Sequence, residues 1–248
     1  RFGAKLGFDI EQKTANAIPS CAPLLGEIPP ARLFDEFLKL FLSGHASATL
    51  EALLRHDLLP YLFDETSHIL HDDDHDLALV RAAMANTDQR IAEDKPVTPA
   101  FLLAALLWPV VRRAATHLEN QGEPPMVAIH NAAQQSIGEA CQQIAIPRRF
   151  SQPMREIWEF QLRLQRRQGK KAAELVEHRR FRAAYDFLLL REQAGEETNG
   201  LGDWWTQYQE LTMEQRLSAA PAGDSSSDEA KSGRRRRRPR NRRSNAGK

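Results

Sequence analysis

The stretch PAFLLAALLWPVV, from Pro99 to Val111, decides the fold of this 248-residue chain. It is apolar almost throughout, which is typical of a helix buried on all sides inside a protein. It falls short of the roughly 20 apolar residues that a membrane-spanning helix needs. Thr98 is a typical N-cap residue and Pro99 suits the first helical position, while Pro109 is expected to kink or end the helix. The stretch therefore predicts a core helix and no membrane span.

Helical spacing of apolar residues continues on both sides of this stretch, and alternating patterns of strand length with turn signals between them are missing. Predicted helices on the N-terminal side are residues 28–46, 49–63 and 74–94, the first two forming a helical hairpin. Predicted helices on the C-terminal side are residues 126–146, 147–171, 178–195 and 201–211. Beyond about Leu217, the Ala, Gly, Ser and Asp content predicts disorder. The sequence predicts an all-α fold.

Charge is distributed unevenly along the chain. The formal net charge is +1, but the terminal run RRRRRPRNRRSNAGK, residues 234–248, holds nine of the 34 Lys and Arg and none of the 33 acidic residues. The remainder has 25 basic against 33 acidic residues, a net charge of −8. Clustered guanidinium groups neutralise phosphates and release counterions, so the tail is typical of nucleic-acid binding. We favour RNA over a solubilising tail or one attracted to anionic lipid.

A second basic region lies inside the predicted folded part, where residues 148–182 hold eleven Lys or Arg against four Glu. Four of these, spaced three or four residues apart, predict one stripe on a helix: Arg163, Arg166, Arg167 and Lys170. Trp158 and Phe160 can stack on bases, although the helical pattern favours the core for Trp158. The predicted RNA-binding residues are Arg148, Arg149, Arg163, Arg166, Arg167, Lys170 and Lys171, with Arg234, Arg235, Arg236, Arg237, Arg238, Arg240, Arg242 and Arg243 in the tail.

The most enzyme-like cluster is HILHDDDHD, residues 68–76. His68, His71 and His75 fall at i, i+3 and i+7 with Asp beside them, and these residue types bind metals. The run lies between predicted helices, so a solvated connection is favoured over a metal site. Phosphate loops, Ser-His-Asp arrangements and CxxC pairs are not visible. The two cysteines, Cys21 and Cys141, are far apart, which fits a reducing cytoplasm and neither a disulfide framework nor a zinc site.

Several strings, in this order, resemble the bacterial poly(A) polymerases. They are RFGAKLGFDIEQKTANAI, IPPARLFDEFLKLFLSGHA, NTDQRI, PAFLLAALLWP, IPRRFSQPMREIWEFQLRLQRRQGKKA and FRAAYDFLLLR, followed by WW and an arginine tail. The likeness runs from Arg1 through about Tyr208, and the tail is similar in kind. The tRNA CCA-adding enzymes are related through the head and neck of that family, but the long basic segment and the tail favour the poly(A) branch.

The resemblance implies that the whole protein adds AMP from ATP to RNA 3′ ends without a template, with ATP and Mg²⁺ as cofactors of the full-length protein. The family's nucleotidyltransferase head, with its metal-binding carboxylates, has no counterpart in these residues. Because the chain opens on RFGAKLGFDI in mid-helix and without Met, we expect a cut N-terminus. Arg1 is carried over from the neck motif as a residue near ATP. No catalytic residue, metal ligand or cofactor is expected in this chain alone, which is predicted to be inactive.

The resemblance also suggests a division of the chain. Residues 1–60 are the end of the neck and the start of a helical body, 61–146 the helical body, 147–217 a basic helical RNA-binding region and 218–248 a disordered arginine-rich tail. The expected partner is RNA, through its 3′ ends and poly(A), with RNA-decay proteins left open as further partners. The expected location is the cytoplasm.

Two alternatives to the polymerase remain at this point. One is a free-standing helical RNA-binding adaptor, which an in-frame start codon next to Arg1 would support and an upstream head with paired carboxylates would exclude. The other is a helical interaction protein whose tail touches membranes, which would bind lipid and show no preference for RNA.

Overall fold

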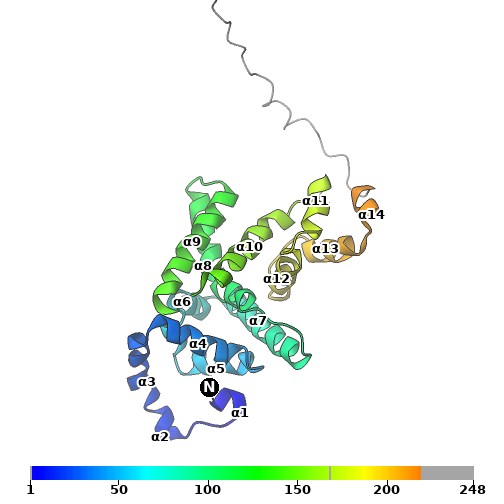
Figure 1. The fold of residues 1–248 in the computed structure, drawn as a ribbon. Coiled ribbons are helices and arrows are strands. Elements are labelled where there is room, and N and C mark those ends of the chain that lie inside the picture. The colour runs from blue at the N-terminus through cyan, green and yellow to red at the C-terminus, as the bar shows by residue number, and fades with distance from the viewer. Residues whose placement is uncertain (1, 168, 219–248) are drawn as a thin grey trace, which may run out of the picture.

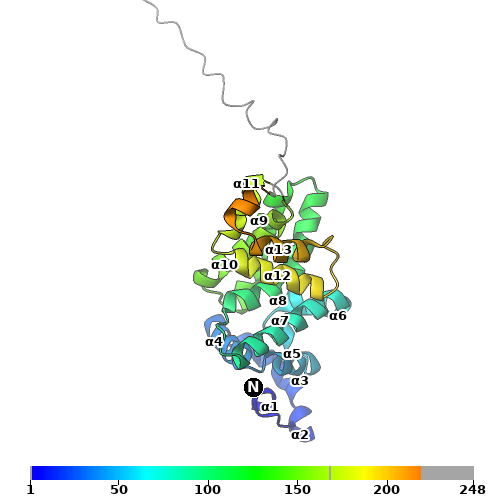
Figure 2. The ribbon, with the colours of Figure 1, turned by 90° about the vertical axis from the view of Figure 1, so that its right-hand side faces the viewer.

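The computed structural model describes residues 2–167 and 169–218 (Figure 1). These residues form helices joined by short connections and contain no strand, which confirms the predicted all-α fold. Figures 1 and 2 both place the first helices at one end of the molecule and α11 at the opposite end. The predicted disordered tail lies outside the described residues, and the division into four regions stays a prediction.

The N-terminal segment consists of short helices with little buried surface. They are α1 (Phe2–Leu6), α2 (Gln12–Ala15), α3 (Ile18–Cys21) and the 3-10 helix η1 (Ala22–Glu27). Gly7 ends α1, with a left-handed φ of +66° that favours glycine. Phe2 and Leu6 are 65% and 51% exposed. The segment contacts the rest of the fold where α1 meets α5 (Ala46–Arg55) and where η1 meets the 3-10 helix η2 (Leu59–Tyr61).

The body of the molecule packs around one long helix. Its elements are α4 (Pro30–Phe41), α5 (Ala46–Arg55), the 3-10 helix η2 (Leu59–Tyr61), α6 (Asp64–Asp72), α7 (Asp74–Ala92), α8 (Pro99–Asn120) and α9 (Pro125–Gln143). The apolar spacing of α4 buries Leu33, Phe34, Phe37 and Phe41 as one face. The predicted hairpin is confirmed by the contact between α4 and α5.

Helix α8 contains the PAFLLAALLWPVV stretch and lies at the centre of the core, in contact with α6, α7, α9, α10 and α12. It is the one described helix long and apolar enough to cross a membrane by length and composition, but 56% of its most apolar window is buried inside the fold. Of the two effects expected of Pro109, a kink or an end of the helix, the second does not occur, because α8 continues to Asn120. A proline inside a helix removes one backbone hydrogen bond and costs about 3 kcal/mol. The packing of α8 on several sides offsets this cost. Thr98 precedes the helix as predicted, but its side chain makes no capping hydrogen bond.

The C-terminal part extends from α10 to a second, smaller apolar cluster. Its helices are α10 (Arg148–Leu164), α11 (Gly169–Val176), α12 (Phe181–Gln193), α13 (Leu201–Glu210) and α14 (Met213–Ser218). One face of α12 is buried in the second cluster, through Phe181, Ala184, Tyr185 and Leu188. Helices α10 and α12 contribute residues to both clusters and so join the C-terminal helices to the body.

Candidate nucleic-acid interface

The predicted RNA-binding cations gather at the two ends of α10. Arg148 and Arg149 form its first turn, whereas Arg163 lies in its last turn. Since an α-helix rises 1.5 Å per residue, the two ends are about 24 Å apart. The cations therefore form two groups and not one layer.

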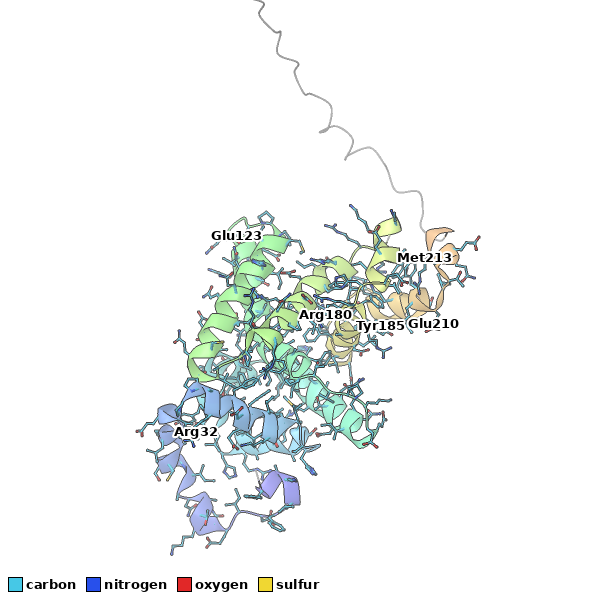
Figure 3. The ribbon with its side chains drawn as sticks, viewed as in Figure 1. Arg32, Glu123, Arg180, Tyr185, Glu210 and Met213 are labelled. Carbon is cyan, nitrogen blue, oxygen red and sulfur yellow. The ribbon has the colours of Figure 1, made fainter. Side chains whose placement is uncertain are left out.

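Helix α4, from a distant part of the sequence, lies against the N-terminal end of α10. The backbone N–H of Ala145, just before α10, donates to the carbonyl of Pro30 at 3.1 Å. The rings of Phe34 and Phe150 lie 5.7 Å apart. These contacts bring the first turn of α4, with exposed Arg32, beside the start of α10. Figure 3 shows Arg32 on α4, well separated from Arg180 beside α12.

The predicted single helical stripe at the other end of α10 is wrong. The helix ends at Leu164, so Arg166 and Arg167 lie in the connection to α11, where Lys170 follows in a new helix. A side chain far along the sequence fixes this end, because the indole N–H of Trp205 donates to the Leu164 carbonyl at 2.8 Å. Arg167 is held in the same way, donating to the carbonyl of Asn199 at 2.8 Å.

Several cations of the basic region are neutralised by carboxylates within the fold. Arg163 lies 3.5 Å from Glu159 and Lys170 lies 3.6 Å from Glu174. Arg179 and Arg180 both pair with Glu156. By contrast, the side chains of four exposed cations of this basic region have no hydrogen-bonding or acidic partner among residues 2–167 and 169–218: Arg148, Arg149, Arg166 and Lys171. These four, with Arg32, are the groups best placed to bind phosphates.

Glu156 shows how the fold holds its paired cations. Burial raises the pKa of this carboxyl, but hydrogen bonds from Arg180 and Gln152 and the nearby guanidinium charges outweigh burial and leave the pKa below its ordinary value. Glu156 therefore stays ionised and ties α10 to the connection between α11 and α12. Arg179 and Arg180 act here as structural residues.

The aromatic residues of α10 belong to the core. Trp158 is fully buried and its indole N–H donates to the carbonyl of Ala104 in α8 at 3.0 Å, which confirms the core assignment. Phe160, predicted as able to stack on bases, is 1% exposed and packs against His178, with ring centroids 4.8 Å apart. That prediction is wrong, because residue 160 lies on the face of α10 that covers the second apolar cluster.

The HILHDDDHD run is helical and not a solvated connection as predicted. His68 and His71 lie in α6, and Asp73 caps α7 by accepting hydrogen bonds from the N–H groups of His75 and Asp76. Asp73 lies 3.3 Å from Arg113, and buried Asp76 lies 3.0 Å from Arg112. Burial raises the pKa of Asp76, against the opposing effect of Arg112. The acidic run thus joins α7 to α8.

Metal ligands do not assemble in the part of the chain that the structure describes. Within residues 2–167 and 169–218, no group of three or more His, Cys, Asp or Glu side chains could hold a metal ion. The three histidines have separate surroundings: His68 lies 3.5 Å from Asp64, and His75 Nδ1 lies 3.2 Å from the Ala194 carbonyl. These residues do not fit an Mg²⁺ site.

Two predicted groups fall outside the described residues, namely Arg1 and the tail arginines at 234–238, 240, 242 and 243. Arg32 was missed by the sequence prediction. It stands 116 residues before Arg148, and no spacing signal joins two positions so far apart.

Two family models match the chain. Residues 7–70 match a family described as "Probable RNA and SrmB- binding site of polymerase A", and residues 121–243 match "Polymerase A arginine-rich C-terminus". The first match contains α4 and the second contains α10 to α14. The two matched segments meet where Ala145 bonds to Pro30.

Curated relatives point the same way. Poly(A) polymerase I of Escherichia coli O6:H1 is 41% identical over 214 residues, which is 84% of this chain and 46% of the relative. Poly(A) polymerase I of Haemophilus influenzae is 36% identical over 225 residues, covering 87% and 49%. The CCA-adding enzyme of Streptococcus gordonii is 47% identical over only 64 residues, covering 26% and 16%. The chain spans about half the length of the polymerases it matches.

Proposed function

The chain belongs to the bacterial poly(A) polymerase family, and from that premise we propose that it is the RNA-binding part of an enzyme that adds AMP from ATP to RNA 3′ ends without a template. The observation that carries this proposal is the position of the unpaired cations. Arg32 and the pair Arg148 and Arg149 come from the two matched segments, which meet where Ala145 bonds to Pro30 and Phe34 packs on Phe150. The extent of the match to poly(A) polymerases favours this function over a free-standing adaptor.

In this proposal the chain holds RNA by its phosphates. Guanidinium groups bind phosphate oxygens and release counterions, without any need to read the base sequence. Such contacts suit a substrate whose end is extended repeatedly by the same nucleotide. The two cation groups lie about 24 Å apart along α10, so a single strand of several nucleotides would be needed to reach both.

The proposal assigns the chemical step to the part of the relatives' length that this chain does not cover. ATP and Mg²⁺ would serve the full-length protein, and the donor groups of the described residues do not fit the metal. The chain alone is proposed to bind RNA without incorporating AMP, to work in the cytoplasm in mRNA processing, and to be open to RNA-decay proteins as further partners.

The test is to incubate the purified chain with labelled oligo(A) and ATP·Mg²⁺, and to measure binding and incorporation in the same samples. We expect oligo(A) to be bound with an affinity that falls as salt rises, and no AMP to be incorporated. Failure to bind RNA at low salt would overturn the proposal. Incorporation of AMP would show that the assignment of the chemistry outside this chain is wrong.

A further inference from the structure

A cavity of 450 Å³ lies beside the N-terminal cation group. Its lining residues come from α4, the end of α9 and the start of α10: Ala31, Phe34, Asp35, Leu38, Cys141, Ala145, Ile146, Pro147 and Arg149. The cavity thus lies between the two segments that match the polymerase families. This volume is within the range of sites that bind small organic groups.

The floor of the cavity is apolar and firmly held. Phe34 is 4% exposed and Ile146 is 7% exposed, so neither moves easily. Phe34 also packs against Phe150, whose ring lies at a centroid distance of 5.7 Å. A flat apolar group can cover the apolar surface that this lining leaves exposed, to which half-buried Leu38 and Pro147 contribute.

The mouth of the cavity carries an anion and a cation that do not pair with each other. The Asp35 carboxylate has no hydrogen-bonding or ionic partner within the described part of the chain, and it is exposed. The Arg149 guanidinium carbon lies 4.9 Å from the centre of the Phe150 ring. This cation–π contact positions the guanidinium group and leaves its N–H groups free to donate hydrogen bonds. No side chain caps the first turn of α10, so its positive end also faces this region.

These features define the chemistry of the ligand. It needs a flat apolar body for the floor, an N–H donor for Asp35 and an anionic group for Arg149. A nucleotide of single-stranded RNA has all three when its base carries an exocyclic amine, as adenine does. The N3–H donor of uracil stands between two carbonyl oxygens, which repel a carboxylate. Resting on the proposed function, we propose that this cavity binds one unpaired RNA base, whose exocyclic amine donates to Asp35 while the adjoining phosphate binds Arg149.

The proposal adds base selectivity to a surface that otherwise binds any polynucleotide. Phosphate contacts hold all sequences alike, whereas a hydrogen bond to a base edge distinguishes between bases. The Asp35 carboxylate by itself repels RNA. An exocyclic amine offsets this repulsion by donating a hydrogen bond to Asp35, whereas the two carbonyl oxygens beside uracil N3–H add to it, so the residue favours adenine over uracil.

The test compares affinities of the full chain for oligo(A) and oligo(U) in the wild type, in Asp35→Ala and in Asp72→Ala. Asp72 is an exposed acidic residue outside the cavity, so its variant has the same net charge as Asp35→Ala. We expect the wild type and Asp72→Ala to prefer oligo(A) by about five- to tenfold, the net effect of one ordinary hydrogen bond, because Asp35 is exposed to water. In Asp35→Ala this ratio should fall toward one, while both affinities stay measurable.

The outcomes separate this inference from the function on which it rests. An unchanged ratio in Asp35→Ala, with RNA still bound, overturns the base site and leaves RNA binding intact. Loss of all RNA binding by the wild type overturns both.

Alkylation of the two cysteines gives an independent readout. Half-buried Cys141 lines the cavity, whereas exposed Cys21 lies elsewhere and serves as the reference. Saturating oligo(A) should slow alkylation of Cys141 and leave Cys21 unaffected. Equal rates for Cys141 with and without oligo(A) would overturn the proposal, because the base would then not occupy the cavity.

Discussion

Replacing Trp158 with Ala tests how α10, which has both cation groups at its ends, is attached to the body. The Trp158 ring is fully buried and its N–H donates to the Ala104 carbonyl in α8 at 3.0 Å. Removing a buried Trp side chain costs about 3–5 kcal/mol, and about 1 kcal/mol of this is the net effect of the hydrogen bond. Natural domains are stable by about 5–15 kcal/mol, so we expect a folded variant with its thermal midpoint lowered by about 10 °C.

Urea unfolding followed by circular dichroism measures this loss. Trp158→Phe keeps an aromatic ring but removes the N–H donor, and it should lose only about 1–2 kcal/mol. Trp204→Ala is the matched control, because Trp204 is half-buried and packs mainly on Tyr208, with ring centroids 4.4 Å apart. If Trp158→Ala loses no more stability than Trp204→Ala, the reasoning is refuted and α10 is not anchored on α8 through this ring.

Two further predictions concern stability. The pKa of Glu156 lies below its ordinary value of 4.5, so the stability it adds is present above that pH and is lost as the pH falls through the folded-state pKa. The unfolding free energies of wild type and Glu156→Gln should therefore differ at pH 7 and converge in acid, and a difference that stays constant down to pH 3 would contradict the role of this carboxyl. In Gly202→Ala the new Cβ would overlap the Glu192 carboxylate, which accepts a hydrogen bond from the Gly202 N–H, so urea unfolding should show a loss of about 1–3 kcal/mol. Gly138→Ala, whose Cβ meets nothing within 4 Å in the middle of α9, should instead gain about 0.5–1 kcal/mol, and equal effects of the two substitutions would contradict this account.

The sequence predicted what depends on local pattern. The spacing of apolar residues predicted the helices α4 and α12, because a helix repeats every 3.6 residues and the core selects one side. The same pattern placed Trp158 in the core correctly. The prediction that Phe160 can stack on bases was wrong, because its neighbours in the second apolar cluster come from α11, α12 and α13.

What could not be predicted depends on contacts between distant residues. Gln165, Arg166 and Arg167 are good helix formers, so the residues directly after Leu164 do not predict the end of α10 there. The Trp205 indole N–H donates a hydrogen bond to the Leu164 carbonyl, where the helix ends. The four cations expected on one face of a single helix are therefore not on one helix. Likewise, only the fold brings the first turn of α4, which contains Arg32, beside the start of α10. The fold also pairs Arg163 with Glu159.

The most direct test of the central claim measures how RNA affinity depends on salt when the unpaired cations are removed. The triple variant Arg148→Ala, Arg149→Ala and Arg166→Ala is compared with the control Arg81→Ala, Arg90→Ala and Lys95→Ala, which removes the same charge outside both matched segments. Each phosphate contact contributes about 0.7 to the slope of log affinity against log salt for single strands, so the first variant should flatten the slope for oligo(A) by about 2. The control should keep the wild-type slope. Equal slopes in both variants would contradict the claim that this surface binds RNA phosphates.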